Sequence, residues 1–223
     1  MGSSVMLNTQ KVVDELYEEF DGLVDRAEIE RLMNDSLDRL GSTANVPDFV
    51  PLMAQRFTWE RLNAMTRRQR RPHGTGPRCY IVFVSLSGGG RGQIAAALTT
   101  LLSGGAVSVH SAGTAANSPL AGDVRSVIAE LGVDPAEAFA RPVTDEVLQA
   151  ADVVVTMGHS VGDVELPSAA RHEDWRVGDP TGAPIEEIRR VRGDIEYRVR
   201  GLLHELGIPV AGEQAAAEPA ATH

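Results

Sequence analysis

Thiol chemistry is almost absent from this chain of 223 residues, which contains a single cysteine, Cys79. One cysteine excludes a disulfide within the chain and any metal site that is built from several cysteines. We accordingly expect neither a metal nor a cofactor. Cys79 opens an apolar stretch, and a cysteine in such a setting usually serves packing, so we expect it to be buried and structural.

Long apolar runs and an excess of positive charge are also missing. No apolar run approaches the roughly 18 residues of a membrane span, and none near the N-terminus resembles a signal sequence. The formal net charge of −10 lacks the basic field that general nucleic-acid binding requires. We therefore expect a cytoplasmic protein with no membrane partner and no general affinity for nucleic acid. A content of 43% hydrophobic and 23% charged residues is typical of a globular chain.

Residues 9–70 carry the spacing of three amphipathic helices. Apolar residues recur every three or four positions over three segments, 10–24, 29–40 and 47–70. This pattern predicts a three-helix bundle, preceded by a loose end at residues 1–8. A bundle of this size has a small core and broad apolar faces, so we expect it to form a homodimer through residues 9–70.

The bundle ends in a cluster of arginines at residues 67–71, followed by a Pro/Gly-rich segment at residues 71–78. The Pro/Gly segment is typical of a linker between domains. The arginine cluster allows two interpretations, a nucleic-acid patch or a solvated basic end of a helix. We favour the second, because the two preceding helices are acidic.

From Cys79 onward, strand patterns alternate with helix patterns. Strands are predicted at 80–84, 106–110 and 153–157, with helices between them and a long helix from residue 185 to about 206. Such alternation predicts an α/β fold whose parallel sheet is covered by helices. We expect this domain to span residues 79–207 and residues 208–223 to be a disordered tail.

The first predicted strand runs into three consecutive glycines and an arginine, just before a helix. Glycines allow successive backbone N–H groups to converge on one point, and a helix N-terminus adds positive potential. The arginine offers a two-pronged donor for a tetrahedral oxyanion. The stretch therefore predicts an anion-binding loop formed by Leu86, Ser87, Gly88, Gly89, Gly90, Arg91 and Gly92. The open alternative is that Arg91 pairs with a carboxylate and the loop holds no ligand.

Five motifs follow one another in this second domain: Gly90-Arg91-Gly92-Gln93, Ser111-Ala112-Gly113-Thr114, Arg141-Pro142-Val143-Thr144, Asp152-Val153-Val154-Val155-Thr156-Met157-Gly158, and Asp174-Trp175 with Gly178-Asp179-Pro180. Their order and spacing resemble the low-molecular-weight protein tyrosine phosphatases and the related thioredoxin- or mycothiol-linked arsenate reductases. The resemblance implies a doubly wound, four-stranded parallel sheet with helices on both faces and the loop at its carboxyl edge. The preceding bundle resembles the helical dimerisation domain that some members carry.

The same resemblance implies roles for individual residues. In this family a cysteine opens the loop, its thiolate attacks phosphorus or arsenic, and an Asp-Pro aspartate protonates the leaving group. Carried over, the nucleophile position is Ser85, the arginine is Arg91 and the general acid is Asp179. By the same comparison Ser111 supports the loop by hydrogen bonding, and Asp174 and Trp175 brace the Asp-Pro loop.

Ser85 replaces the family's cysteine, and this substitution is severe for the chemistry. A serine hydroxyl stays protonated unless a base lies beside it, whereas a cysteine with a lowered pKa attacks as the thiolate. The family usually has Asn at the position of Gly88, and Ser or Thr at the position of Gly92. The reductase branch also needs further thiols, which one cysteine cannot supply. Arsenate reduction by the family mechanism is therefore excluded for this sequence.

The leading hypothesis is a catalytically degenerate phosphatase-like protein that binds an oxyanion or a phosphorylated ligand in the loop 85–92. The alternative is an active enzyme that uses Ser85, Arg91 and Asp179 on a phosphorylated substrate, because pure binding does not need a general acid. A second alternative, regulatory nucleic-acid binding through the helical domain, depends only on the arginine cluster.

Overall fold

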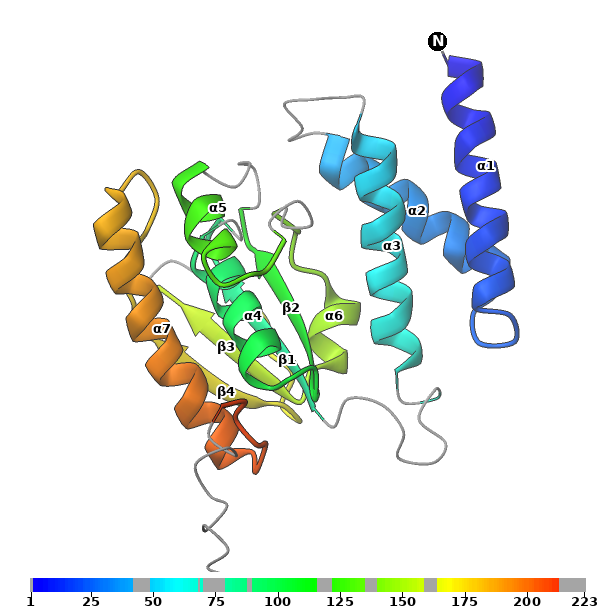
Figure 1. Cartoon of the computed structure of the whole chain (residues 1–223). Helices are drawn as coiled ribbons and strands as arrows, with labels where there is room; N and C mark the ends of the chain where they lie inside the picture. The colour runs from blue at the N-terminus through cyan, green and yellow to red at the C-terminus, as the bar shows by residue number, and fades with distance from the viewer. Residues whose placement is uncertain are drawn as a thin grey trace, which may run out of the picture.

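The computed structural model describes residues 2–41, 49–67, 69, 79–87, 90–115, 122–134, 140–158 and 164–212. Three helices come first, α1 (Gly2–Glu19), α2 (Arg26–Gly41) and α3 (Val50–Thr66). An α/β unit follows, with β1 (Cys79–Ser85), α4 (Arg91–Leu102), β2 (Val107–Gly113), α5 (Gly122–Ala129), α6 (Asp145–Ala150), β3 (Val153–Met157), β4 (Arg171–Trp175) and α7 (Ile185–Glu205). Figure 1 shows these two parts side by side.

The four strands form one parallel sheet in the order β2-β1-β3-β4, which confirms the predicted fold class. Every residue of β1 is buried, as expected for a parallel strand with helices on both of its faces. The chain leaves β1 to form β2 on one side and later returns to form β3 on the other. This reversal places a topological switch point, where such folds usually bind ligands, at the carboxyl end of β1.

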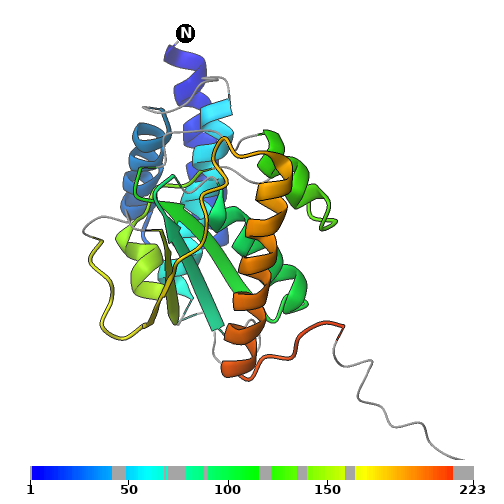
Figure 2. The ribbon, with the colours of Figure 1, turned by 90° about the vertical axis from the view of Figure 1, so that its left-hand side faces the viewer.

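The sheet has two differently covered faces. On one face α4, α5 and α7 pack against Ile81, Phe83 and Val155. On the other face α6 packs against Val82 and Val84, and Ala64 of α3 joins the same cluster. Figures 1 and 2 show α3 and α6 on the side of the sheet opposite α4 and α7. One helix of the bundle is thus part of the layer that covers the sheet.

The bundle has a core of its own, to which all three helices contribute (Val12, Val13, Leu16, Phe20, Ile29, Leu32, Met33, Leu40, Val50, Ala54, Phe57 and Leu62). The prediction of a loose end at residues 1–8 is wrong for residues 2–8, because α1 already begins at Gly2.

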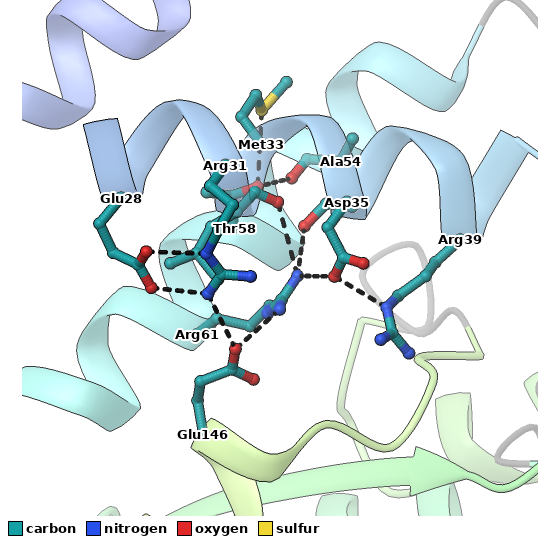
Figure 3. A network of polar contacts seen from close by, with 11 residues as sticks. Glu28, Arg31, Met33, Asp35, Arg39, Ala54, Thr58, Arg61 and Glu146 are labelled. Atoms are coloured by element: carbon teal, nitrogen blue, oxygen red, sulfur yellow. Dashed lines mark hydrogen bonds and ion pairs between the residues drawn. The ribbon is translucent and has the colours of Figure 1, made fainter. Parts of the chain in front are cut away.

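Arg61 of α3 links the bundle to the α/β unit. Its side chain is only 2% exposed, yet its guanidinium reaches Asp35 of α2 at 2.6 Å and Glu146 of α6 at 2.9 Å. Figure 3 shows Arg61 between these two carboxylates, with α2 above and α6 below. Because a buried charge is costly unless it is paired, this arrangement ties the two parts to each other.

A second link comes from the arginine cluster. Arg67 lies 2.7 Å from the carboxylate of Asp152 and stacks over the ring of Tyr80. It is therefore neither a nucleic-acid contact nor a solvated helix end, and both interpretations of the sequence are wrong for this residue. Arg68, Arg70 and Arg71, like the predicted linker 71–78, lie outside the described residues.

The α/β unit extends beyond the predicted boundary at residue 207. Ile208 and Val210 are buried in the main core, and the amide of Ala211 donates to the carbonyl of Leu102 at 2.7 Å. The prediction that the disordered tail begins at residue 208 is therefore wrong for residues 208–211. Residues 213–223 lie outside the described part of the chain. None of the helices described is long and apolar enough to cross a membrane.

Candidate oxyanion-binding site

The predicted loop joins the buried end of β1 to the N-terminus of α4. Ser85 closes β1 and is buried, and α4 opens with a hydrogen bond from the amide of Ile94 to the carbonyl of Gly90. An α-helix leaves its first N–H groups without intrahelical acceptors, and no side chain caps α4. This end of α4 therefore presents the positive potential that an anion requires. Gly88 and Gly89 lie outside the described residues.

Two glycines let other groups approach the loop closely. A Cβ atom on Gly92 would overlap the hydroxyl of Ser111 and lie 3.6 Å from the hydroxyl of Ser85. A Cβ atom on Gly90 would lie 2.9 Å from the ring of Pro180. Ser111 therefore lies against Gly92, and the Asp-Pro loop lies against Gly90.

Ser111 lies in β2, which continues three residues beyond its predicted end at His110. Its side chain is 3% exposed, and its Oγ has no hydrogen-bond partner among the residues that the structure describes. An unpartnered buried hydroxyl carries an energetic cost that a bound acceptor would relieve. The hydroxyl of Ser111 is therefore a donor available at the N-terminus of α4.

Arg91, the first residue of α4, reaches groups that follow β3 and β4. Its guanidinium lies 3.4 Å from a carboxylate oxygen of Asp179 and 3.5 Å from the carbonyl of Val177. Both contacts are long for bonds from a charged donor, which usually measure about 2.7–2.9 Å. The structure therefore brings Arg91 and Asp179 together, but only loosely.

Gly158, directly after β3, lets the Arg91 side chain pass. A Cβ atom on Gly158 would lie 2.5 Å from Nη1 of Arg91, and the backbone of Gly158 has a φ of +91°. Both observations require glycine at this position. Reasoning from the sequence did not single out Gly158 for the site, although a glycine at the carboxyl end of a strand was a visible signal.

Asp179 has a half-exposed carboxylate, with its side chain 56% exposed. Burial alone would raise its pKa, but hydrogen bonds from Thr181 and the charge of Arg91 outweigh it, so the pKa lies below its usual value. The Thr181 bonds and the Arg91 charge thus favour the ionised form of the Asp179 carboxylate.

The two residues predicted to brace the Asp-Pro loop lie in β4. Trp175 is buried against Phe83, and its indole N–H donates to Glu173 at 2.7 Å. Its carbonyl accepts from the amide of Val177, two residues before Asp179. Asp174 instead accepts from the hydroxyl of Thr156 on β3. The role predicted for this pair stays a prediction.

Two other polar candidates lie away from the loop. Cys79 is buried at the opposite end of β1 from Ser85, as predicted. His110 sits on the other face of the sheet, beside Glu60 of α3. Burial lowers the pKa of His110 to about 4, despite the nearby charge of Glu60. Neither residue reaches the predicted anion site.

The fold and the site together define a parallel α/β protein with a phosphatase-type loop between its first strand and first sheet-packing helix. The model of the low molecular weight phosphotyrosine protein phosphatases matches residues 80–211. This is more than half of the chain, which therefore belongs to that family. The model of the protein-tyrosine-phosphatase-like N-terminal domain matches residues 9–66.

Several similar proteins and solved structures are named as arsenate reductases. A putative arsenate reductase of Halobacterium salinarum is 36% identical over 37% of this chain. The matched stretch covers 58% of the length of that protein. The arsenate reductase of Brevibacillus brevis is 30% identical over 54% of this chain and 90% of its own length. Among solved structures, the thioredoxin-dependent arsenate reductase of Corynebacterium glutamicum is 28% identical with a TM-score of 0.79, over 93% of this chain and 98% of its own.

A shorter solved structure matches the α/β unit. It is an arsenate reductase in the phosphate binding state, 27% identical with a TM-score of 0.51, over 57% of this chain and 98% of its own. The Corynebacterium structure thus covers nearly the whole chain, whereas this structure and the Brevibacillus relative match little more than half of it.

Proposed function

We propose that this chain binds arsenate or phosphate in the loop 85–92 and carries out no thiolate chemistry there. The observation that carries the proposal is the buried hydroxyl of Ser111, which has no hydrogen-bond partner among the described residues and lies against Gly92 at the N-terminus of α4. With Arg91 on the same turn, these groups form a set of donors for a tetrahedral anion. Similar proteins include arsenate reductases, one of them solved in a phosphate binding state, which supports this class of ligand.

Electron balance argues against arsenate reduction within this chain. Reducing arsenate to arsenite takes two electrons, which a pair of thiols can supply by forming a disulfide. Ser85 cannot be oxidised in this way, and Cys79 lies six residues away along β1. At about 3.3 Å per residue in a strand, this separation is roughly 20 Å. The chain therefore fits binding of arsenate better than its reduction.

Hydrolysis of a phosphorylated substrate is less well supported. It would need Asp179 to donate a proton to the leaving group, but the lowered pKa of Asp179 favours the ionised form. It would also need Ser85 to attack as an alkoxide, and His110, a base that could assist, lies on the other face of the sheet.

The binding proposal is tested by calorimetric titration with arsenate and with phosphate. We expect both anions to bind, and Arg91→Gln to weaken binding at least tenfold, because one charge-assisted pair contributes about 1.5–3 kcal/mol. Arg176→Gln is the matched control, an exposed arginine just after β4 that should leave binding unchanged. Absence of binding to the unaltered chain would refute the proposal.

An assay with an aryl phosphate separates binding from catalysis. We expect no turnover by the unaltered chain or by Ser85→Ala. Activity that appears only in Ser85→Cys would support a binding scaffold that has lost its nucleophile. Turnover by the unaltered chain that Ser85→Ala abolishes would establish the alternative, a serine-dependent enzyme.

We also propose that the bundle mediates a homodimer. Three apolar side chains are exposed: Phe49, directly before α3, and Leu52 and Trp59 on α3. Exposed apolar side chains that lie together favour association. Light scattering on Leu52→Asp tests this, with Leu101→Asp, an exposed leucine on α4, as the control. We expect only the first variant to be monomeric. If both variants keep the mass of the unaltered chain, the assigned surface is wrong.

A further inference from the structure

Glu60 of α3 makes a two-pronged ion pair across the two parts of the chain. Arg141 donates to its carboxylate through Nε at 2.5 Å and through Nη2 at 2.7 Å. Both side chains are nearly buried. Burial alone would raise the pKa of Glu60, but the charge of Arg141 outweighs it, so Glu60 stays ionised. The bidentate geometry fixes the orientation of the arginine as well as its position.

Arg141 begins a short segment that continues the sheet edge beside β2. Its carbonyl accepts from the amide of Gly113 at 2.7 Å, and the amide of Val143 donates to the carbonyl of Gly113 at 3.1 Å. Gly113 and Pro142 form an isolated parallel bridge. The end of β2 is therefore held from the outside by the residues that Glu60 anchors.

The end of β2 in turn holds the first residues of the anion loop. Gly113 pairs with Ser85 in the sheet register, and the amide of Thr114 donates to the carbonyl of Ser85 at 3.1 Å. The next amide, of Ala115, donates to the carbonyl of Leu86 at 2.7 Å. An unbroken series of contacts thus runs from α3 to the start of the loop.

Other groups also face the carboxylate of Glu60. Arg56, one turn earlier on α3, lies at 3.3 Å, and the Nδ1 atom of His110 lies at 3.8 Å. Arg56 is exposed, so its pair with Glu60 contributes less than the buried pair with Arg141. The bond to Arg141 is the one that connects Glu60 with the loop.

We infer that Glu60 is a positioning residue for the anion loop, acting through Arg141 and Gly113 on Ser85 and Leu86. The inference rests on the proposed function, since the property it tunes is the affinity for the anion. The N-terminal helical part would thus help to position the anion loop, although none of the residues of that helical part lies in the loop.

The test compares two carboxylate-to-amide variants at the same interface. Glu60→Gln removes the charge that holds Arg141, and Asp152→Asn removes the charge that holds Arg67. Asp152 precedes β3 and so lies at the amino edge of the sheet, far from the loop. Arsenate affinity is measured by calorimetry on the full chain below its unfolding temperature. Hydrogen exchange of the Gly113, Thr114 and Ala115 amides is measured in parallel.

We expect Glu60→Gln to weaken arsenate binding about tenfold, in line with the coupling usual for packed networks, and Asp152→Asn to change it less than twofold. Exchange at the three amides should accelerate only in Glu60→Gln. Glu60→Asp, which keeps the charge, should restore most of the affinity. Equal affinity of Glu60→Gln and the unaltered chain overturns the inference, and so does an equal loss in Asp152→Asn.

A failure of the proposed function is recognised separately, because the unaltered chain then binds no arsenate. Hydrogen exchange alone decides the inference in that case. Faster exchange at Gly113 and Thr114 in Glu60→Gln supports the positioning role, and unchanged exchange refutes it.

Discussion

The guanidinium of Arg91 lies 3.4 Å from the carboxylate of Asp179, directly against the backbone of Gly158. The one cation that the family motif places beside the anion loop thus faces a negative charge when no ligand is bound.

Asp179→Asn should tighten arsenate binding. The substitution removes a negative charge that competes with the anion for Arg91, and a partly exposed pair of this kind is worth up to about 1 kcal/mol, or roughly fivefold in affinity. Calorimetric titration at low ionic strength measures the change. Asp194→Asn is the control, because Asp194 is exposed on α7 and pairs with Arg198 instead of Arg91. Weaker binding by Asp179→Asn would show that the carboxylate assists the site.

Gly158→Ala should displace Arg91 and weaken arsenate binding at least tenfold. The new methyl group would lie 2.5 Å from Nη1, and the positive φ adds strain of about 1 kcal/mol. Gly182→Ala is a matched control, because Gly182 also has a positive φ but nothing lies within 4 Å of its Cβ position. Both variants should unfold at lower temperature, but only the first should lose affinity. Equal affinities would contradict the predicted placement of Arg91.

The stability of the fold should fall as the pH drops from 6.5 to 4.5, through His110. Burial lowers the pKa of this histidine from 6.5 to about 4 in the folded state, so over this range the unfolded chain binds more protons. Linkage then predicts a loss of about 2 kcal/mol across the window. Aspartates and glutamates whose pKa the fold lowers add to the loss mainly below about pH 5, because their unfolded pKa values lie near 4.

Urea unfolding at several pH values measures this dependence. His110→Gln should flatten the curve between pH 6.5 and 4.5. His172→Gln, at an exposed histidine of β4, should leave the slope unchanged. A slope that survives in His110→Gln would assign the proton uptake to another group.

Arg61→Met should destabilise the fold by about 3–5 kcal/mol, because it leaves the carboxylates of Asp35 and Glu146 without their shared partner in a largely buried setting. Arg39→Met is the matched control, since Arg39 pairs with the same Asp35 but is exposed, and it should cost less than about 1 kcal/mol. Chemical unfolding gives both values. Similar losses in the two variants would mean that burial of Arg61 is of little consequence.

Local patterns in the sequence were sufficient for most of the fold. Apolar periodicity located β1, β2, β3 and the long helices but not the mostly polar β4, and the order of motifs predicted the parallel sheet that the structure confirms. The predicted boundaries were wrong where an apolar pattern ended. The run of β2 past His110 was missed, because Ser111, Ala112 and Gly113 carry little strand propensity, and their places in the ladder come from pairing with β1. Ile208 and Val210 were missed because two apolar residues near a Pro/Ala-rich tail form no period.

Contacts between α3 and the sheet could not have been predicted in the same way. Glu60 and Arg141 are 81 residues apart along the chain, and no periodicity connects residues at that separation. The arginine cluster was interpreted as solvated because the sequence does not show whether an arginine has a carboxylate partner in the folded structure. Only the packing of α3 on the sheet shows that Arg67 is paired with Asp152.

The sequence by itself determined the family motifs, the place of Arg91 and Asp179 in them, and the serine where the family has a cysteine, because these depend on residue identity and spacing along the chain. Only the tertiary structure decided that Ser111 is an unpartnered donor beside Gly92, that Gly158 makes room for Arg91, and that the bundle supports the sheet edge behind the loop. Each of these depends on burial and close approach between segments far apart in the chain, which are properties of packing rather than of local pattern.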